Sequence, residues 1–210
     1  MTAVRGTGRP LLALGGAMVL VVLSALAFAL LTAGPGSAGT PGKDSPDAGF
    51  ARDMAIHHQQ AVEMSLIVRD RTDDEDVRRL AYDVINTQAN QRGMLLGWLE
   101  VWGLPKSSSE PPMTWMGHGM AYTPHDGALM PGMATNAELR RLNAADGKAA
   151  EVLYLRLMTA HHQGGVEMAA AAADLARTEQ VKRLAAGMVR GQEAEIGLMA
   201  DMLAARGAST

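Results

Sequence analysis

The 210-residue sequence contains no cysteine, so it offers neither a disulfide bond nor a thiolate metal ligand, and no cysteine for a lipid anchor. Aromatic residues make up only 4% of the chain, whereas alanine, leucine and methionine are plentiful. This composition favours helices over sheets. The formal net charge is −3 and no basic stripe occurs, so nothing in the sequence indicates nucleic-acid binding.

The first 33 residues differ from the rest in being almost free of charge. Arg5 and Arg9 precede a run of 23 uncharged residues that ends at Ala33. Such a run is long enough to cross a bilayer as a helix and longer than the usual core of a signal peptide. We therefore expect residues 1–33 to form a membrane anchor, with the N-terminus in the cytoplasm and the rest outside. The alternative is cleavage after Ala33 or Ala38, which would release a secreted protein.

The remainder of the chain is predicted to be a flexible linker followed by one helical domain. Residues 34–46 are rich in glycine, proline and serine, as flexible linkers are. Residues 47–206 predict a four-helix bundle with a Met- and His-rich loop at 104–134. The helices are expected at about 47–70, 73–102, 135–176 and 178–206, with Asp73 as the N-cap of the second, a capping box at Thr135–Glu138, and a break at Asp146–Gly147.

The helical domain contains an internal repeat. A shift of 104 residues places Phe50–Leu99 on Tyr154–Leu203 without a gap, and both copies contain Met-x-x-His-His-Gln-x-x-Val-Glu-Met. A gapless match through two helices and their turn indicates a duplicated helical hairpin. Two such hairpins, each with one apolar face, would bury those faces against each other as a four-helix bundle.

The histidines of the repeat fall on a stripe that should face the bundle interior. A helical wheel places Phe50, Met54, His57, Ala61, Met64 and Val68 on one stripe of the first copy, and Tyr154, Met158, His161, Gly165, Met168 and Ala172 on the matching stripe of the second. His57 and His161 are therefore expected inside, with methionine on either side. His58 lies about a quarter-turn away. Asp53, one turn before His57, is a supporting residue that could hydrogen-bond to it.

Methionine and histidine together suggest a soft-metal site. Thioether sulfur is a soft ligand and imidazole a borderline one, and the pair suits Cu(I). The candidate ligands on the helices are Met54, His57, His58, Met64, Met158, His161, His162 and Met168. The other reading stays open: methionine commonly fills gaps in cores, and a buried histidine is commonly a hydrogen-bonded core residue.

A di-iron centre, by contrast, is not expected. Di-iron bundles carry glutamate three residues before histidine on two inward-facing helices. Here Met54 and Met158 stand three residues before His57 and His161, so soft sulfur replaces the hard carboxylate in both copies.

The loop between the copies is a third candidate metal site. Its methionines and histidines are Met113, Met116, His118, Met120, His125, Met130 and Met133. Four of these lie within eight residues, and a loop can fold around an ion. The alternative is a Gly/Pro/Met-rich linker without a metal.

The repeated motif resembles the domain-of-unknown-function 305 family. The matching segments are Phe50–Met64, the Met-Pro-Gly-Met run at 130–133, Met158–Met168 and Gln192–Met199. The resemblance covers residues 47–205. It implies a ferritin-like four-helix bundle, exported or membrane-anchored, and copper binding through the helix Met and His residues, as in some members. The family commonly has a Phe-Asp pair before the second motif, where this sequence has Ala150-Glu151.

We therefore expect an all-α, ferritin-like four-helix bundle outside the cytoplasm that binds and sequesters copper and is not an enzyme. The expected partners are a copper ion, the membrane through the N-terminal helix, and either a second copy or a partner protein, but no nucleic acid. The alternative is a structural or interaction module whose His/Met stripes are core packing. Because Asp53 corresponds to Leu157, the two copies are expected to be equal in fold and unequal in chemistry.

Overall fold

The computed structural model describes residues 39–117 and 122–210. In these residues the fold is all-α, as predicted, with helices α2 (Pro46–Arg69), α3 (Glu75–Val101), α4 (Asn136–Ala144), α5 (Gly147–Leu175) and α6 (Glu179–Ala205), and a 3-10 turn, η1 (Thr114–Met116). The predicted membrane anchor at 1–33 lies outside the described residues. None of the described helices combines the length and apolar character needed to cross a membrane.

Side-chain caps set the first turn of three helices. Ser45 accepts a hydrogen bond from the backbone N–H of Ala48 at the start of α2. The predicted capping box between Thr135 and Glu138 is present at the start of α4. The prediction of Asp73 as the cap of α3 was wrong by one residue. The neighbouring Asp74 has the extended backbone of an N-cap and accepts from the third N–H of the helix.

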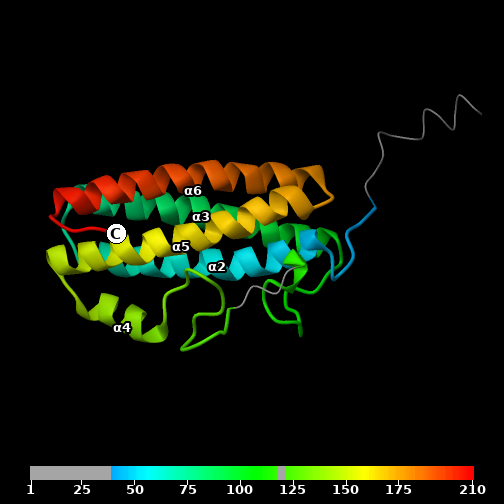
Figure 1. The fold of residues 1–210 in the computed structure, drawn as a ribbon, viewed down its shortest axis with the longest axis horizontal. Helices are drawn as coiled ribbons and strands as arrows, with labels where there is room; N and C mark the ends of the chain where they lie inside the picture. Colours follow the sequence, from blue (N-terminus) through cyan, green and yellow to red (C-terminus); the bar gives the residue numbers. More distant parts are fainter. Residues whose placement is uncertain (1–38, 118–121) are drawn as a thin grey trace, which may run out of the picture. The chain divides into compact units, whose positions relative to one another are not determined.

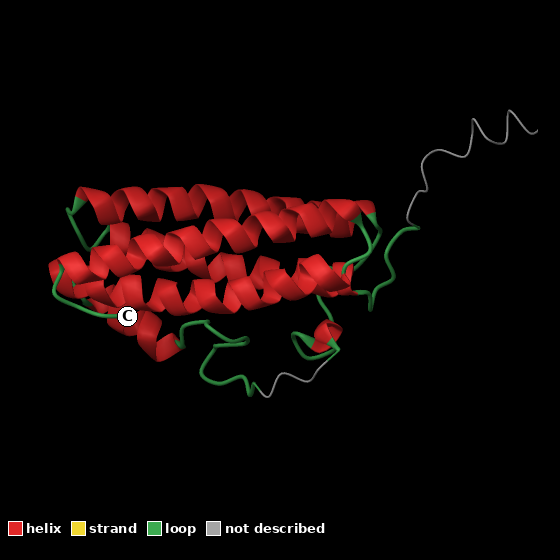
Figure 2. Cartoon of the chain, turned by 45° about the horizontal axis from the view of Figure 1, so that its top comes forward, coloured by secondary structure: helices red, strands yellow, loops and turns green. Residues whose placement is uncertain are grey.

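Four long helices run side by side as two hairpins (Figures 1 and 2). Helix α2 packs along α3, α5 packs along α6, and the hairpins meet where α2 crosses α5. The predicted break at 146–147 is real: α4 ends at Ala144, and Gly147 begins α5 with a φ of +52°. Residues 40–210 form one compact unit with its own core.

Two buried carboxylates tie each hairpin to the turn of the other. Asp47, at the start of α2, accepts hydrogen bonds from the backbone of Arg177 and from the backbone and hydroxyl of Thr178. Glu151, its counterpart in the repeat, accepts from the Thr72 hydroxyl and from Arg206. These contacts show that α2 and α5 are antiparallel, since the start of each lies at the end of the other. The antiparallel pairing brings the middles of α2 and α5, and with them the two motifs, together.

Candidate metal centre

A pair of facing histidines lies at the centre of the bundle. His57 of α2 and His161 of α5 are fully buried, and their ring centroids are 3.7 Å apart with 33° between the ring planes. The Nε2 of His161 lies 2.9 Å from the carbonyl oxygen of His57. A carbonyl only accepts, so His161 Nε2 carries the proton and donates it. The prediction that His57 and His161 face the interior is therefore confirmed.

A second histidine in each motif turns toward the next helix of its own hairpin. His58 Nε2 lies 2.8 Å from Gln91 Oε1 on α3, and His162 Nε2 lies 2.6 Å from Glu195 Oε2 on α6. Both imidazoles are fully buried. Each His-His pair therefore spreads across two helix interfaces, and the ring centroids within a pair lie more than 6 Å apart.

Five ring nitrogens of the four motif histidines have no hydrogen-bond partner. The Nδ1 atoms of His58, His161 and His162 are buried and unpaired, and so are both ring nitrogens of His57. Where Nε2 donates, a neutral imidazole leaves a lone pair on Nδ1. A buried polar atom without a partner costs on the order of 1–3 kcal/mol. Each of these lone pairs could instead bind a metal ion or accept a proton.

Burial keeps the central rings neutral. It lowers the pKa of His58 to about 3 and lowers the pKa values of His57 and His161 well below the usual 6.5. The nearby imidazoles lower the pKa values of His57 and His161 further, because two positive rings this close would repel each other. The carbonyl of Pro131 opposes the shift at His57, although it does not reach hydrogen-bond geometry. Neutral imidazole is the form that binds metals.

The stripe methionines lie on both sides of the histidine pair. Met54 and Met168 belong to one buried cluster, and Met64 and Met158 belong to the other. All four side chains are fully buried. The helix register places Met54 one turn before His57 and His58, and the repeat places Met158 likewise before its pair. We refer to Met54, His57 and His58 as the first half-site, and to Met158, His161 and His162 as the second.

The loop methionines pack onto the bundle. Met113 and Met130 are buried in the cluster that contains Met54, and Met116 and Met133 pack against it. His125 is exposed, with its Nδ1 at 3.1 Å from the backbone oxygen of Thr123. His118 and Met120 lie outside the described residues. Two of the four described methionines are thus core residues and the other two pack against the core, and a loop metal site stays a prediction.

Asp53 supports the loop rather than His57. Its carboxylate accepts hydrogen bonds from the backbone N–H of Met113 and from Trp115 Nε1, at 2.7 and 2.8 Å. Burial raises the pKa of Asp53, and these two donors and Arg52 oppose the rise. The predicted hydrogen bond from Asp53 to His57 is therefore wrong, because the loop supplies closer donors. The difference between Asp53 and its counterpart Leu157 therefore affects how the loop is attached to the bundle, because Asp53 binds loop residues and not a histidine.

The Met-Pro-Gly-Met segment lies directly against α5. Gly132 has a φ of +79°, and a Cβ built on it would lie 2.4 Å from the Ala160 carbonyl oxygen. A Cβ built on Gly164 would lie 2.2 Å from the Pro131 carbonyl oxygen. The two glycines let the segment approach within one turn of the second His-His pair. Gln60 fixes its far end by exchanging hydrogen bonds with the backbone of Ala134.

Sequence reasoning missed the polar partners of the histidines. Gln91 and Glu195 occupy equivalent positions in the repeat, 33 residues after His58 and His162. Gln88 and Gln192, one turn earlier, are buried with unpaired side-chain amides. The signal was present in the sequence, because glutamine recurs at 88 and 192 inside otherwise apolar helical faces. Without the packing of α3 and α6, nothing linked these positions to the histidines.

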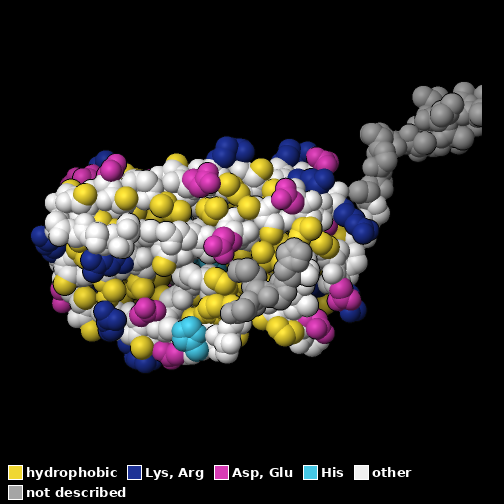
Figure 3. Space-filling view, in the orientation of Figure 1, with side chains coloured by type: hydrophobic (Ala, Val, Ile, Leu, Met, Phe, Trp, Pro, Cys, Tyr) yellow, Lys and Arg dark blue, Asp and Glu magenta, His cyan; other side chains and the backbone are white. Residues whose placement is uncertain are grey.

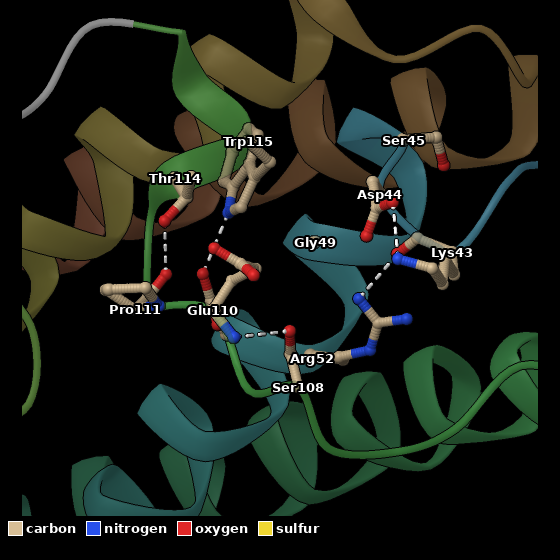
Figure 4. A pocket seen from close by; sticks show the side chains of 11 residues that line it. Lys43, Asp44, Ser45, Gly49, Arg52, Ser108, Glu110, Pro111, Thr114 and Trp115 are labelled. Carbon is tan, nitrogen blue, oxygen red and sulfur yellow. Dashed lines mark hydrogen bonds and ion pairs between the residues drawn. The ribbon is translucent and has the colours of Figure 1, made fainter.

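One surface pocket of the described residues lies beside the start of α2 and offers no soft metal ligand. Its volume is about 310 Å³, and the eleven residues that line it, taken from within 43–53 and 108–115, include no histidine or methionine. In Figure 4 the Arg52 side chain points toward Lys43, whose carbonyl accepts its hydrogen bond. On the face in Figure 3, acidic and basic side chains are interspersed with apolar ones. Among the described residues, no three His or carboxylate side chains converge as a metal centre.

The duplicated hairpins and their buried histidines, whose ring nitrogens are only partly paired, define an all-α bundle protein with a polar centre. The chain belongs to the DUF305 family: the family profile, described as a domain of unknown function, matches residues 47–203. No curated protein matches the sequence.

Solved structures of the family share the bundle. A DUF305 protein from Streptomyces coelicolor, described as a candidate secreted protein, is 64% identical, with 80% of this chain and 98% of that chain covered and a TM-score of 0.75. A DUF305 fragment from Deinococcus radiodurans is 31% identical over 73% of this chain and 92% of that one, with a TM-score of 0.60.

The bundle is also similar to CopM. In its Cu(I)-bound form, CopM is 22% identical, with 73% of this chain and 91% of that chain covered and a TM-score of 0.56. In its Cu(II)-bound form it is 24% identical over 74% and 93%, with a TM-score of 0.55. At this level of identity the likeness shows a shared fold.

Proposed function

We propose that the bundle binds copper, as Cu(I), at the two central half-sites and sequesters it without catalytic turnover. The observation that carries the proposal is the set of buried imidazole nitrogens that have no hydrogen-bond partner. A core histidine kept only for packing would pair its polar atoms. Unpaired lone pairs beside buried methionines are instead what a metal ligand set requires.

The ligand chemistry favours a soft ion. His161 and His162 donate through Nε2 and leave a lone pair on Nδ1, and His58 does the same where Gln91 presents its amide oxygen. Together with the sulfur of Met54 and Met158, these neutral donors suit Cu(I), whereas Mg²⁺ and Ca²⁺ prefer oxygen. Burial lowers the pKa values of His58 and His161, so both rings are neutral at pH 7. Protons therefore compete little with a metal ion for their lone pairs.

Two comparisons support this reading. CopM, which has the same bundle fold, is described in Cu(I)-bound and Cu(II)-bound forms. The Streptomyces coelicolor relative is described as a candidate secreted protein. We place the bundle outside the cytoplasm, either anchored by residues 1–33 or released after cleavage.

The test is Cu(I) uptake by the fragment 40–210, measured by competition with a chromogenic Cu(I) chelator. The His57→Leu/His161→Leu double variant is expected to lose most of the uptake. It should fold at least as well without metal, since leucine removes unpaired polar atoms from the core. The Met94→Leu variant removes an exposed methionine of α3 that belongs to none of the candidate sites, so it is the control and should bind as the parent does. Equal Cu(I) uptake by the parent and the double variant would refute the proposal.

The alternative, a structural or interaction module, makes the opposite prediction. If the histidines only pack the core, the double leucine variant would change neither metal content nor function. Metal analysis of purified parent and variant by mass spectrometry distinguishes the two readings, because only the copper reading predicts metal that disappears with the histidines.

A further inference from the structure

The two half-sites differ in one polar partner. His58 and His162 occupy equivalent positions in the repeat, and each faces a residue on the following helix. In the first hairpin this residue is Gln91, a neutral amide. In the second it is Glu195, a carboxylate, and its distance to the ring nitrogen is shorter, at 2.6 Å against 2.8 Å.

A carboxylate constrains the proton on its histidine more strictly than an amide does. A Glu195 carboxylate only accepts hydrogen bonds, so Nε2 of His162 donates to it, and in the neutral ring the lone pair lies on Nδ1. Gln91 can turn its amide and offer either an oxygen or an NH2 group, so His58 is free to adopt either tautomer.

Glu195 also brings a negative charge to the second half-site at small cost. Its side chain is 26% exposed, whereas the His162 ring is fully buried. The carboxylate therefore keeps part of its hydration while its hydrogen bond reaches into the core. A carboxylate behind a ligand histidine fixes the ring orientation and increases its basicity toward the metal.

We propose that Glu195 is a positioning residue that makes the second half-site the stronger copper site, with the first half-site weaker because Gln91 replaces the carboxylate. This inference rests on the proposed copper binding and adds an order to it: copper fills Met158, His161 and His162 first. The duplicated bundle thus has two inequivalent sites. The difference in copper affinity comes from Gln91 on α3 and Glu195 on α6, which lie outside the His-His motifs.

The first measurement needs no metal. Nitrogen-15 NMR of the imidazoles in the fragment 40–210 at neutral pH should show His162 wholly in the form protonated at Nε2. The Glu195→Gln variant should show exchange between two tautomers at this ring. The exposed Glu193→Gln variant, on the same helix, should leave the ring unchanged. A His162 that already samples both tautomers in the parent overturns the inference.

The second measurement exchanges the two partners. Glu195→Gln is expected to weaken the tighter copper site by about 10- to 100-fold, the usual loss for such a partner. Gln91→Glu is expected to strengthen the weaker site by a comparable factor. A gain of affinity on adding a carboxylate is an effect that a merely structural residue would not produce.

The outcomes separate the two proposals. If the parent binds no Cu(I), the proposed function fails, and the order of filling fails with it. If the parent binds Cu(I) and both exchanged variants bind it with unchanged affinities, the role of Glu195 is refuted while copper binding stands.

Discussion

At the residue scale, the centre of the bundle carries a stability cost. Most buried polar groups in proteins are paired, yet several ring nitrogens of the four motif histidines are not. The buried amides of Gln88 and Gln192 add to this set. Proteins commonly give up stability at the residues that carry function. The cost is therefore evidence for a ligand, because packing alone would favour leucine at these positions.

The buried histidines predict a loss of stability in acid. The unfolded chain protonates each histidine below about pH 6.5, whereas folded His58 protonates only near pH 3. Since the unfolded state binds more protons between these values, the free energy of unfolding falls as the pH is lowered through this range. The expected loss is about 1.4 kcal/mol per pH unit for each such histidine.

Urea unfolding of the metal-free fragment at pH 7, 6 and 5 measures this slope. His58→Gln removes one of the buried histidines and should reduce the slope of the free energy of unfolding against pH by about 1.4 kcal/mol per pH unit. A free energy of unfolding that does not vary over this range would contradict the lowered pKa values.

At the scale of elements, the contact between the Met-Pro-Gly-Met segment and α5 depends on the absence of a side chain. The Pro131 carbonyl oxygen would lie 2.2 Å from a Cβ at position 164. A backbone carbonyl cannot move without moving its segment, and this segment is fixed by the hydrogen bonds between Gln60 and Ala134. The loop is thus attached to both α2 and α5.

Gly164→Ala is therefore expected to destabilise the bundle by about 1–3 kcal/mol through overpacking. Gly187→Ala is the matched control, since Gly187 lies within α6 and a Cβ built there meets no atom within 4 Å. That variant should gain about 0.5–1 kcal/mol from helix propensity. Thermal unfolding of both variants tests the expected opposite signs, and a stabilised Gly164→Ala would show that the segment yields freely.

At the scale of the whole bundle, the two hairpins are held in register by carboxylates at their ends. Asp47 is fully buried and receives three hydrogen bonds from the turn between α5 and α6. Glu151 accepts one hydrogen bond from Thr72 in the opposite turn. Because both ends are fixed, α2 and α5 cannot slide, and the two histidines meet ring to ring.

Asp47→Ala should lower the free energy of unfolding by about 2–3 kcal/mol, because it leaves buried donors of Thr178 without an acceptor. Asp44→Ala, which removes only an exposed pair with Lys43, should change it by less than about 1 kcal/mol. Denaturant unfolding of the fragment 40–210 measures both. Equal effects of the two substitutions would show that Asp47 does not fix the register.

The sequence by itself determined the fold class, the positions of the helices and the duplication, because helix periodicity, caps and a gapless repeat are local signals. It also placed His57 and His161 on the inward face. Tertiary structure decided the partners: Asp53 contacts the loop instead of His57, the described loop methionines lie in the core or pack against it, and Gln91 and Glu195 reach the outer histidines. The hydrogen bonds of Asp53 and of the two outer histidines join residues 33 to 62 positions apart, and only the packing of helices and loop on one another brings them together.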